Sequence, residues 1–144
     1  MRNRLSELPH VLEQLEAMMR GTGLAADEAA DLRLMAEEVL SNIVKYAFED
    51  EREHVIEVSV RAVEHEAALA FRDDGRAFDP LADPVPEPQP TAVERPAGGL
   101  GLVLVRALAD QASYRRSGGC NILALTKRLP GRAAAGRAGN REKE

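Results

Sequence analysis

Three short segments of this sequence carry groups that are suited to chemistry. In the first, AEEVLSNIVKYAF, Glu38 and Asn42 lie four residues apart and therefore share one face of a predicted helix. They flank the apolar stripe of that helix. From there a carboxylate can accept a proton in a cleft, and an amide oxygen can bind a hard cation. The alternative interpretation of the same pattern is a solvated helix edge.

The second and third segments are turns that contain glycine. In FRDDGRAFDP, Asp73 ends a predicted strand and can accept a hydrogen bond from an amino group, while Gly75 lets a flat ligand lie against the backbone. In GGLGLVLVRALAD, Gly98, Gly99 and Gly101 precede a predicted helix whose first N–H groups can bind an anion. Taken singly, both segments are also compatible with ordinary turns.

Hydrophobic periodicity predicts the elements that must position these groups. Apolar residues at a spacing of three or four indicate helices, and alternation of apolar with polar residues indicates strands with one buried face. The predicted helices cover about residues 8–19, 27–48 and 102–110, and the predicted strands 56–60, 68–72, 112–116 and 122–127. This order indicates an α/β protein.

The composition favours one acidic domain. The chain has 144 residues, 44% of them hydrophobic, which is enough to bury a core. The net charge of −5 argues against nucleic-acid binding, because phosphate contacts need a basic face. Cys120 is the single cysteine, so an intramolecular disulfide is excluded. With no apolar run of about 20 residues and no signal-peptide pattern, we expect a cytoplasmic protein without membrane contact.

Two segments differ in composition from the rest. Residues 81–97 contain five prolines, which disfavour helix, and a loop of this length inside a compact domain is typical of a lid. Residues 130–144 combine basic and small residues and are predicted to be a disordered tail. We therefore expect a single domain over residues 1–129.

Several common site patterns are excluded. The P-loop pattern is absent, and the third glycine of a dinucleotide-binding fingerprint would fall at Leu104. The three histidines, His10, His54 and His65, are too scattered to predict a histidine-rich metal site.

In combination, the three segments resemble the Bergerat ATP-binding fold of the gyrase, heat-shock chaperone, histidine kinase and mismatch-repair superfamily. Within it, they are most similar to the anti-sigma factor serine/threonine kinases. Residues 38–42 resemble the N box, 73–79 a variant G1 box with Phe-Asp in place of a second glycine, and 98–102 the G2 box. Residues 121–127 resemble the final strand. The resemblance covers about residues 8–129.

The resemblance implies a fold, cofactors and residue roles. The fold is an α/β (α+β) two-layer sandwich, with a mixed, mostly antiparallel sheet covered on one face by about three helices. The cofactors are ATP and Mg²⁺. Glu38 would be the general base, Asn42 the Mg²⁺ ligand, Asp73 the acceptor for the adenine amino group, and Gly75 would leave space for the ring. The further nucleotide-binding residues that the resemblance implies are Phe78, Arg95 near the γ-phosphate, Gly98, Gly99, Leu100, Gly101 and Leu102.

The resemblance also implies a function. The chain would phosphorylate a STAS-type anti-anti-sigma protein, sequester a sigma factor, and form a homodimer. A nucleotide-dependent binding module without transfer activity is the first alternative, and a scaffold with a vestigial site is the second. Two features depart from the family pattern. Tyr46 stands where relatives often have His, and the N-terminus is short for the usual first strand, so the sheet should lose an edge strand or pair differently there.

Overall fold

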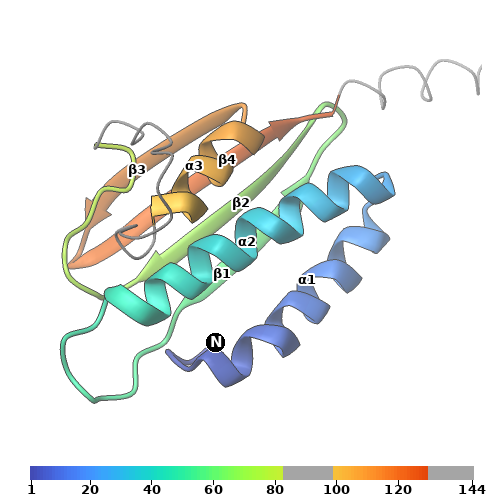
Figure 1. The fold of residues 1–144 in the computed structure, drawn as a ribbon. Helices are drawn as coiled ribbons and strands as arrows, with labels where there is room; N and C mark the ends of the chain where they lie inside the picture. The colour runs from blue at the N-terminus through green and yellow to red at the C-terminus, as the bar shows by residue number, and fades with distance from the viewer. Residues whose placement is uncertain (83–98, 130–144) are drawn as a thin grey trace, which may run out of the picture.

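The computed structural model describes residues 1–82 and 99–129, which form one layer of helices on one layer of sheet (Figure 1). The helices are η1 (Leu5–Glu7), α1 (Leu8–Gly21), α2 (Ala26–Tyr46) and α3 (Gly99–Leu108). The strands are β1 (Glu57–Ala62), β2 (Glu66–Asp73), β3 (Gln111–Ser117) and β4 (Cys120–Arg128). The α-helices all cover the same face of the sheet (Figure 1), which confirms the predicted two-layer α/β sandwich.

The strand order in the sheet is β1-β2-β4-β3. Every strand pair within the described residues is antiparallel, whereas a mixed, mostly antiparallel sheet was expected. The β3–β4 hairpin turns at Gly118 and Gly119, whose φ angles of 58° and 77° lie in the left-handed region that glycine adopts without strain. In the β2–β4 ladder, Asp73 lies directly opposite Asn121.

The core lies between the helices and one face of the sheet. Along β2, the side chains of Ala67, Leu69 and Phe71 are buried at alternate positions, as expected for a strand with one covered face. Met19 is fully buried and is part of the core, whereas Met18 is 53% exposed and is not. The buried apolar residues contributed by the helices are Leu8, Val11, Leu12, Leu15, Met19, Leu32, Met35, Ala36, Val39, Leu40 and Val105.

The first residues of the chain pair with the segment before β1. Arg2 and Val55 form an isolated antiparallel bridge, and the Asn3 amide donates to the His54 carbonyl at 3.1 Å. The Ile56 amide donates to the Met1 carbonyl at 2.7 Å. At this edge the sequence predicted a lost or differently paired strand, and the structure has an isolated bridge there.

The start of the third helix was predicted wrongly. The predicted helix began at Leu102, after the glycines, and a glycine within a helix costs about 1 kcal/mol relative to alanine. The structure starts α3 at Gly99. Because α3 packs against α2 and buries Val105, tertiary contacts offset the low helix propensity of the glycines.

Two of the expected segments lie largely outside the described residues. Only residues 81 and 82 of the predicted lid are described, and they form a turn. The predicted tail at 130–144 lies wholly outside. Within residues 1–82 and 99–129, no helix is both long enough and apolar enough to span a bilayer.

Candidate functional site

Asp73 is a buried carboxylate at the end of β2, with 6% of its surface exposed. Its Oδ1 atom accepts hydrogen bonds from the Gly75 amide at 2.9 Å and from Asn121 Nδ2 at 3.0 Å. Its Oδ2 atom has no hydrogen-bond partner among the described residues. A carboxylate oxygen can accept hydrogen bonds, so this oxygen is suited to a donor on a ligand.

Gly75 lies against the C-terminal end of α2. The Arg76 amide donates to the Ala47 carbonyl at 2.9 Å, which holds the turn after β2 on the residue that follows α2. A Cβ atom added at Gly75 would lie 2.6 Å from the Ala47 carbonyl oxygen and 2.8 Å from Asp73 Oδ1. The close approach of two backbone segments therefore requires a glycine at this position.

We expect Gly75→Ala to destabilise the protein by about 1–3 kcal/mol, because the added methyl group displaces backbone atoms that cannot move aside cheaply. Gly21→Ala is the matched control, since an added Cβ there meets nothing within 4 Å. The free energy of unfolding from urea titration measures both changes. Equal stability of the two variants would show that the turn moves freely away from Ala47.

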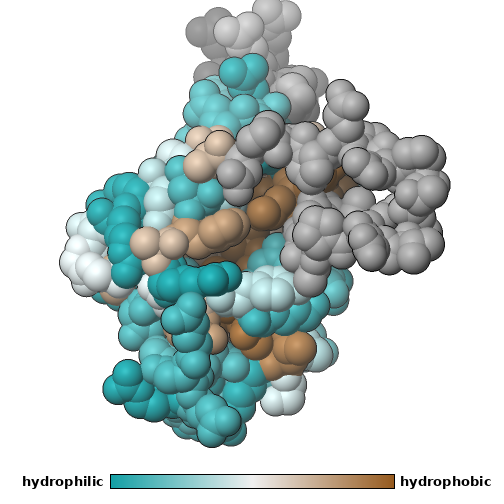
Figure 2. Space-filling view, turned by 60° about the vertical axis from the view of Figure 1, so that its left-hand side comes forward, coloured by the Kyte–Doolittle hydropathy of each residue, from teal (hydrophilic) through white to brown (hydrophobic). Residues whose placement is uncertain are grey.

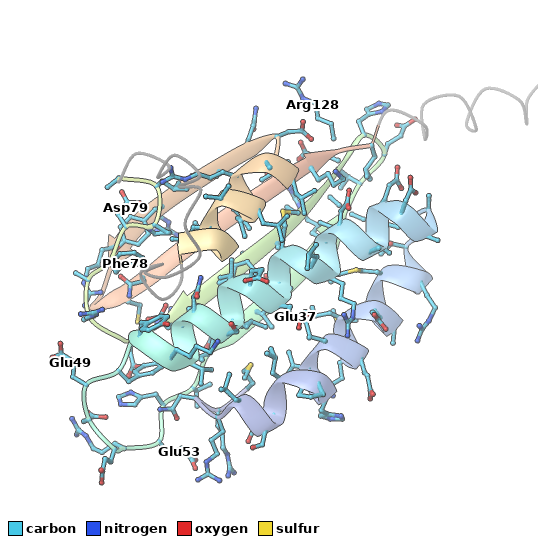
Figure 3. All side chains as sticks on the ribbon, viewed as in Figure 1. Glu37, Glu49, Glu53, Phe78, Asp79 and Arg128 are labelled. Carbon is cyan, nitrogen blue, oxygen red and sulfur yellow. The ribbon has the colours of Figure 1, made fainter. Side chains whose placement is uncertain are left out.

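Glu38 and Asn42 are half-buried on α2, and neither side chain has a hydrogen-bond or ion-pair partner among the described residues. The adjacent Glu37 differs, because its carboxylate pairs with Arg33 at 3.4 Å, and Arg33 also pairs with Glu16 of α1. Figure 3 shows Glu37 on the side of α2 that faces α1. Successive helix residues are about 100° apart around the axis, so Glu38 lies on a different side. Its carboxylate is not engaged in the α1–α2 contact.

The first turn of α3 contains Gly99, Leu100 and Gly101. The first N–H groups of a helix have no partner within the helix, so this turn offers donors to an anion. Figure 1 shows α3 beside α2 on the sheet. The next residue, Leu102, is half-buried. Two other candidates, Arg95 and Gly98, lie outside the described residues.

The segment that follows β2 is held against α3. Arg106 of α3 donates to the Pro80 carbonyl at 2.6 Å, and the Leu81 amide donates to Asp79 Oδ1 at 2.8 Å. Phe78 is 50% exposed, and Figure 3 places it with Asp79 at the end of the sheet opposite Arg128. With this side turned forward, Figure 2 shows an apolar area bordered by hydrophilic residues.

Two features of this region were not predicted from the sequence. Asn121 was noted only as part of the final strand, yet it is buried and contacts Asp73 directly. The available signal was a polar side chain at the first of three alternate strand positions, of which the next two are Leu123 and Leu125. The second feature is His54, which was treated as one of three scattered histidines.

His54 joins the segment after α2 to the turn after β2. Its ring stacks on Phe48 with centroids 4.3 Å apart, Nε2 lies 2.6 Å from Asp50 Oδ1, and Nδ1 lies 3.0 Å from Asp74 Oδ1. The hydrogen bond to Asp50 is the main cause that raises the pKa of His54, and Asp74 adds to it. The same contact lowers the pKa of Asp50 to about 2, with help from Arg52. Both ring nitrogens therefore face carboxylates, an arrangement that favours the imidazolium ion.

We expect His54→Gln to destabilise the protein more at about pH 5.5 than at about pH 8.5. A raised pKa in the folded state means that the stabilisation from His54 is complete below its ordinary pKa of 6.5 and disappears as the pH rises through the raised value. The stabilisation from the Asp50 carboxylate is complete above its ordinary pKa of 3.8, and it is lost only as the pH falls through the lowered pKa of about 2. Thermal unfolding at several pH values checks this. His65→Gln, at an exposed histidine, is the control, and a deficit independent of pH would contradict the assignment.

Residues 1–127 match the family described as the histidine kinase-like ATPase domain. The chain is 36% identical to the serine/threonine-protein kinase BtrW of Bordetella bronchiseptica over 95 residues, which are 66% of this chain and 67% of that protein. It is 30% identical to the serine-protein kinase RsbW of Bacillus velezensis over 113 residues, or 76% of this chain and 70% of that one. The Bacillus subtilis RsbW kinase is 28% identical with the same coverage.

Solved structures agree in fold. A blue-light activated histidine kinase of Erythrobacter litoralis superposes with a TM-score of 0.54 at 22% identity, over 77% of this chain and 33% of that one. Its separate histidine kinase domain gives a TM-score of 0.53 at 19% identity, over 90% of this chain and 62% of the domain structure. The family match, the relatives and the two-layer fold agree with one another. The chain belongs to the histidine kinase-like ATPase domain family and, within it, to the anti-sigma factor serine/threonine kinases.

Proposed function

We propose that this kinase transfers the γ-phosphoryl group of ATP to a serine of a STAS-type anti-anti-sigma protein. The observation that carries the proposal is Asp73, a buried carboxylate at the end of β2 whose Oδ2 has no partner among the described residues. An exocyclic amino group such as that of adenine supplies the missing donor. Gly75 next to it would let the ring lie against the backbone, with the exposed Phe78 at its margin.

The phosphates would lie at the start of α3. The N–H groups of the first turn have no partner within the helix, and they and the positive end of the helix favour an anion there, which supports phosphate binding by Gly99 and Gly101. The remaining residues proposed for this role are Gly98, Leu100, Leu102 and, near the γ-phosphate, Arg95. Residues 81–97 would close over the nucleotide as a lid.

Asn42 is the proposed protein ligand of Mg²⁺. The described residues contain no cluster of three or more His, Cys, Asp or Glu side chains that could hold a metal ion. That fits Mg²⁺, which commonly uses few protein ligands and takes the rest from substrate phosphates and water. The amide of Asn42, half-buried and without a partner in the described part of the chain, is suited to that use. When bound, Mg²⁺ neutralises charge on the phosphates.

Glu38 is the proposed general base. It lies one helical turn before Asn42 on α2, and its carboxylate has no partner among the described residues. A carboxylate free of ion pairs can accept the proton of a serine hydroxyl as that oxygen attacks the phosphoryl group. Phosphoryl transfer otherwise needs mainly positioning and charge neutralisation.

The proposed partners follow from the same function. The unmodified STAS-type protein would bind the kinase and displace a sigma factor, and phosphorylation would release it. We propose that the chain acts in the cytoplasm as a homodimer, with one domain over residues 1–129, and that it binds neither nucleic acid nor membrane. The acidic net charge of −5 supports the absence of nucleic-acid binding. The alternative is a partner-switching module that binds ATP without transferring phosphate.

The test is ATP binding by calorimetry with and without Mg²⁺, followed by incubation with each purified STAS-type protein of the source organism. We expect binding that strengthens with Mg²⁺ and a phosphoserine detectable by mass spectrometry. Binding without phosphoserine on any of these proteins would favour the module without transfer activity. An absence of binding would refute the nucleotide site and leave a scaffold.

A further inference from the structure

Asn121 makes four hydrogen bonds of 3.0 Å or shorter, all to protein atoms, and its Oδ1 also accepts from the Phe78 amide at 3.5 Å. Its Oδ1 accepts from the Tyr114 hydroxyl at 2.6 Å and from Arg116 at 2.8 Å. Its Nδ2 donates to Asp73 Oδ1 at 3.0 Å and to the Arg76 carbonyl at 2.8 Å. A carboxamide has two donor hydrogens and an oxygen with two lone pairs, so these contacts use its full capacity. Asn121 therefore has no group left for a ligand and acts through Asp73.

Arg116 fixes which way the amide of Asn121 points. A guanidinium group can only donate hydrogen bonds, so the atom of Asn121 that faces it must be the oxygen. Arg116 is itself held in place by the carbonyls of Gly75 and Gly119, each at 3.1 Å. The amide nitrogen must then face Asp73. Because Asn121 is only 7% exposed, water does not readily replace these partners.

The two carboxylate oxygens of Asp73 therefore have different roles. Two N–H donors, from Gly75 and Asn121, hold Oδ1 on the protein side, and this leaves Oδ2 as the acceptor for a ligand. We propose that Asn121 is a positioning residue for nucleotide binding, which orients the Asp73 carboxylate toward the amino group of the base. This inference rests on the proposed function.

Asn121→Asp tests the proposal through its dependence on pH. The new carboxylate is nearly the same size and still accepts from Tyr114 and Arg116, but it cannot donate to Asp73. At about pH 8 we expect ATP affinity to fall about 10- to 100-fold, because a buried acceptor loses its donor beside a second negative charge. Two carboxylates this close share a proton in acid. At about pH 5.5 a shared proton should restore the hydrogen bond and most of the affinity.

Other charged or titratable groups lie near the pair. Arg116 and Tyr114 of β3 contact Asn121. His54 contacts Asp74, the residue that follows Asp73 in the chain. The Arg76 side chain pairs with Glu49 at 3.9 Å. These groups and the nucleotide phosphates are the same in the wild type and the variant. The measured quantity is therefore the ratio of the two dissociation constants at each pH, from calorimetry with ATP at fixed Mg²⁺.

Two further variants complete the experiment. Tyr114→Phe removes one donor while Arg116 still orients the amide, so we expect less than about a threefold change in ATP affinity at any pH. If Asn121→Asp does not fold, as judged by circular dichroism, Arg116→Met is decisive. It leaves Asp73 untouched and removes the guanidinium donor to the amide, although the Tyr114 hydroxyl and, at 3.5 Å, the Phe78 amide still donate, so it should weaken ATP binding about 3- to 10-fold.

A folded Asn121→Asp variant that binds ATP like the wild type, or one with a loss independent of pH, would overturn the positioning role. So would wild-type affinity in a folded Arg116→Met variant, should that one be needed. Failure of the wild type to bind ATP would instead refute the proposed function.

Discussion

Glu38→Gln is expected to slow phosphoryl transfer by about 10²- to 10⁴-fold while ATP affinity stays within about twofold of the wild type. The glutamine amide has nearly the shape of the carboxylate but cannot take the serine proton. Nucleotide affinity should persist because Glu38 is assigned to the hydroxyl nucleophile, whereas the base and phosphates are assigned to Asp73 and α3. Transfer is measured as phosphoserine formed per unit time under saturating ATP, and affinity by calorimetry.

Glu37→Gln is the matched control for this experiment. Glu37 precedes Glu38 on the same helix and is also half-buried, but it pairs with Arg33. Its replacement should leave transfer unchanged and cost little stability, since ion pairs on partly exposed side chains contribute at most about 1 kcal/mol. If both variants transfer phosphate at the wild-type rate, the general base is not on this part of α2. If Glu38→Gln loses ATP binding instead, its role is nucleotide binding.

Asp73→Asn is expected to weaken ATP binding by about 100-fold, through a predictable orientation of the new amide. The Gly75 amide and Asn121 Nδ2 both donate to position Oδ1, so the oxygen of an asparagine at 73 must stay on that side. Its NH₂ group then points where Oδ2 was and meets the amino group of adenine, donor against donor. The fold should survive, because both protein hydrogen bonds are kept.

The orientation of the new amide also predicts a change of nucleotide specificity. A nucleotide with a carbonyl oxygen at position 6 of the purine, such as inosine triphosphate, offers an acceptor to the NH₂ group. We expect the Asp73→Asn variant to prefer inosine triphosphate to ATP, and the wild type to show the opposite order, in parallel calorimetric titrations. Asp74→Asn, at an exposed carboxylate that contacts His54, is the control and should bind ATP within about threefold of the wild type. Unchanged ATP affinity in Asp73→Asn would place the adenine elsewhere.

Local patterns were sufficient to predict most of the elements. Apolar residues recur at a spacing of three or four in α1 and α2 and alternate with polar residues in β1. These patterns arise from contacts between near neighbours and from one buried face, so they are visible in the sequence. The spacing of Glu38 and Asn42 is of the same kind. The start of α3 was wrong, because helix propensity is a weak preference that packing against α2 overrides.

Contacts between distant segments decided the rest. The sequence by itself determined the order of the elements and the side chains at each candidate position, which follow from periodicity and spacing, while the two-layer fold class came from the resemblance of its three segments to a known family. Only the tertiary structure placed Ala47 against Gly75, His54 between two carboxylates, and Asn121 opposite Asp73. The reason is physical. Strand register and loop packing join residues tens of positions apart, and no local preference of either partner encodes that pairing.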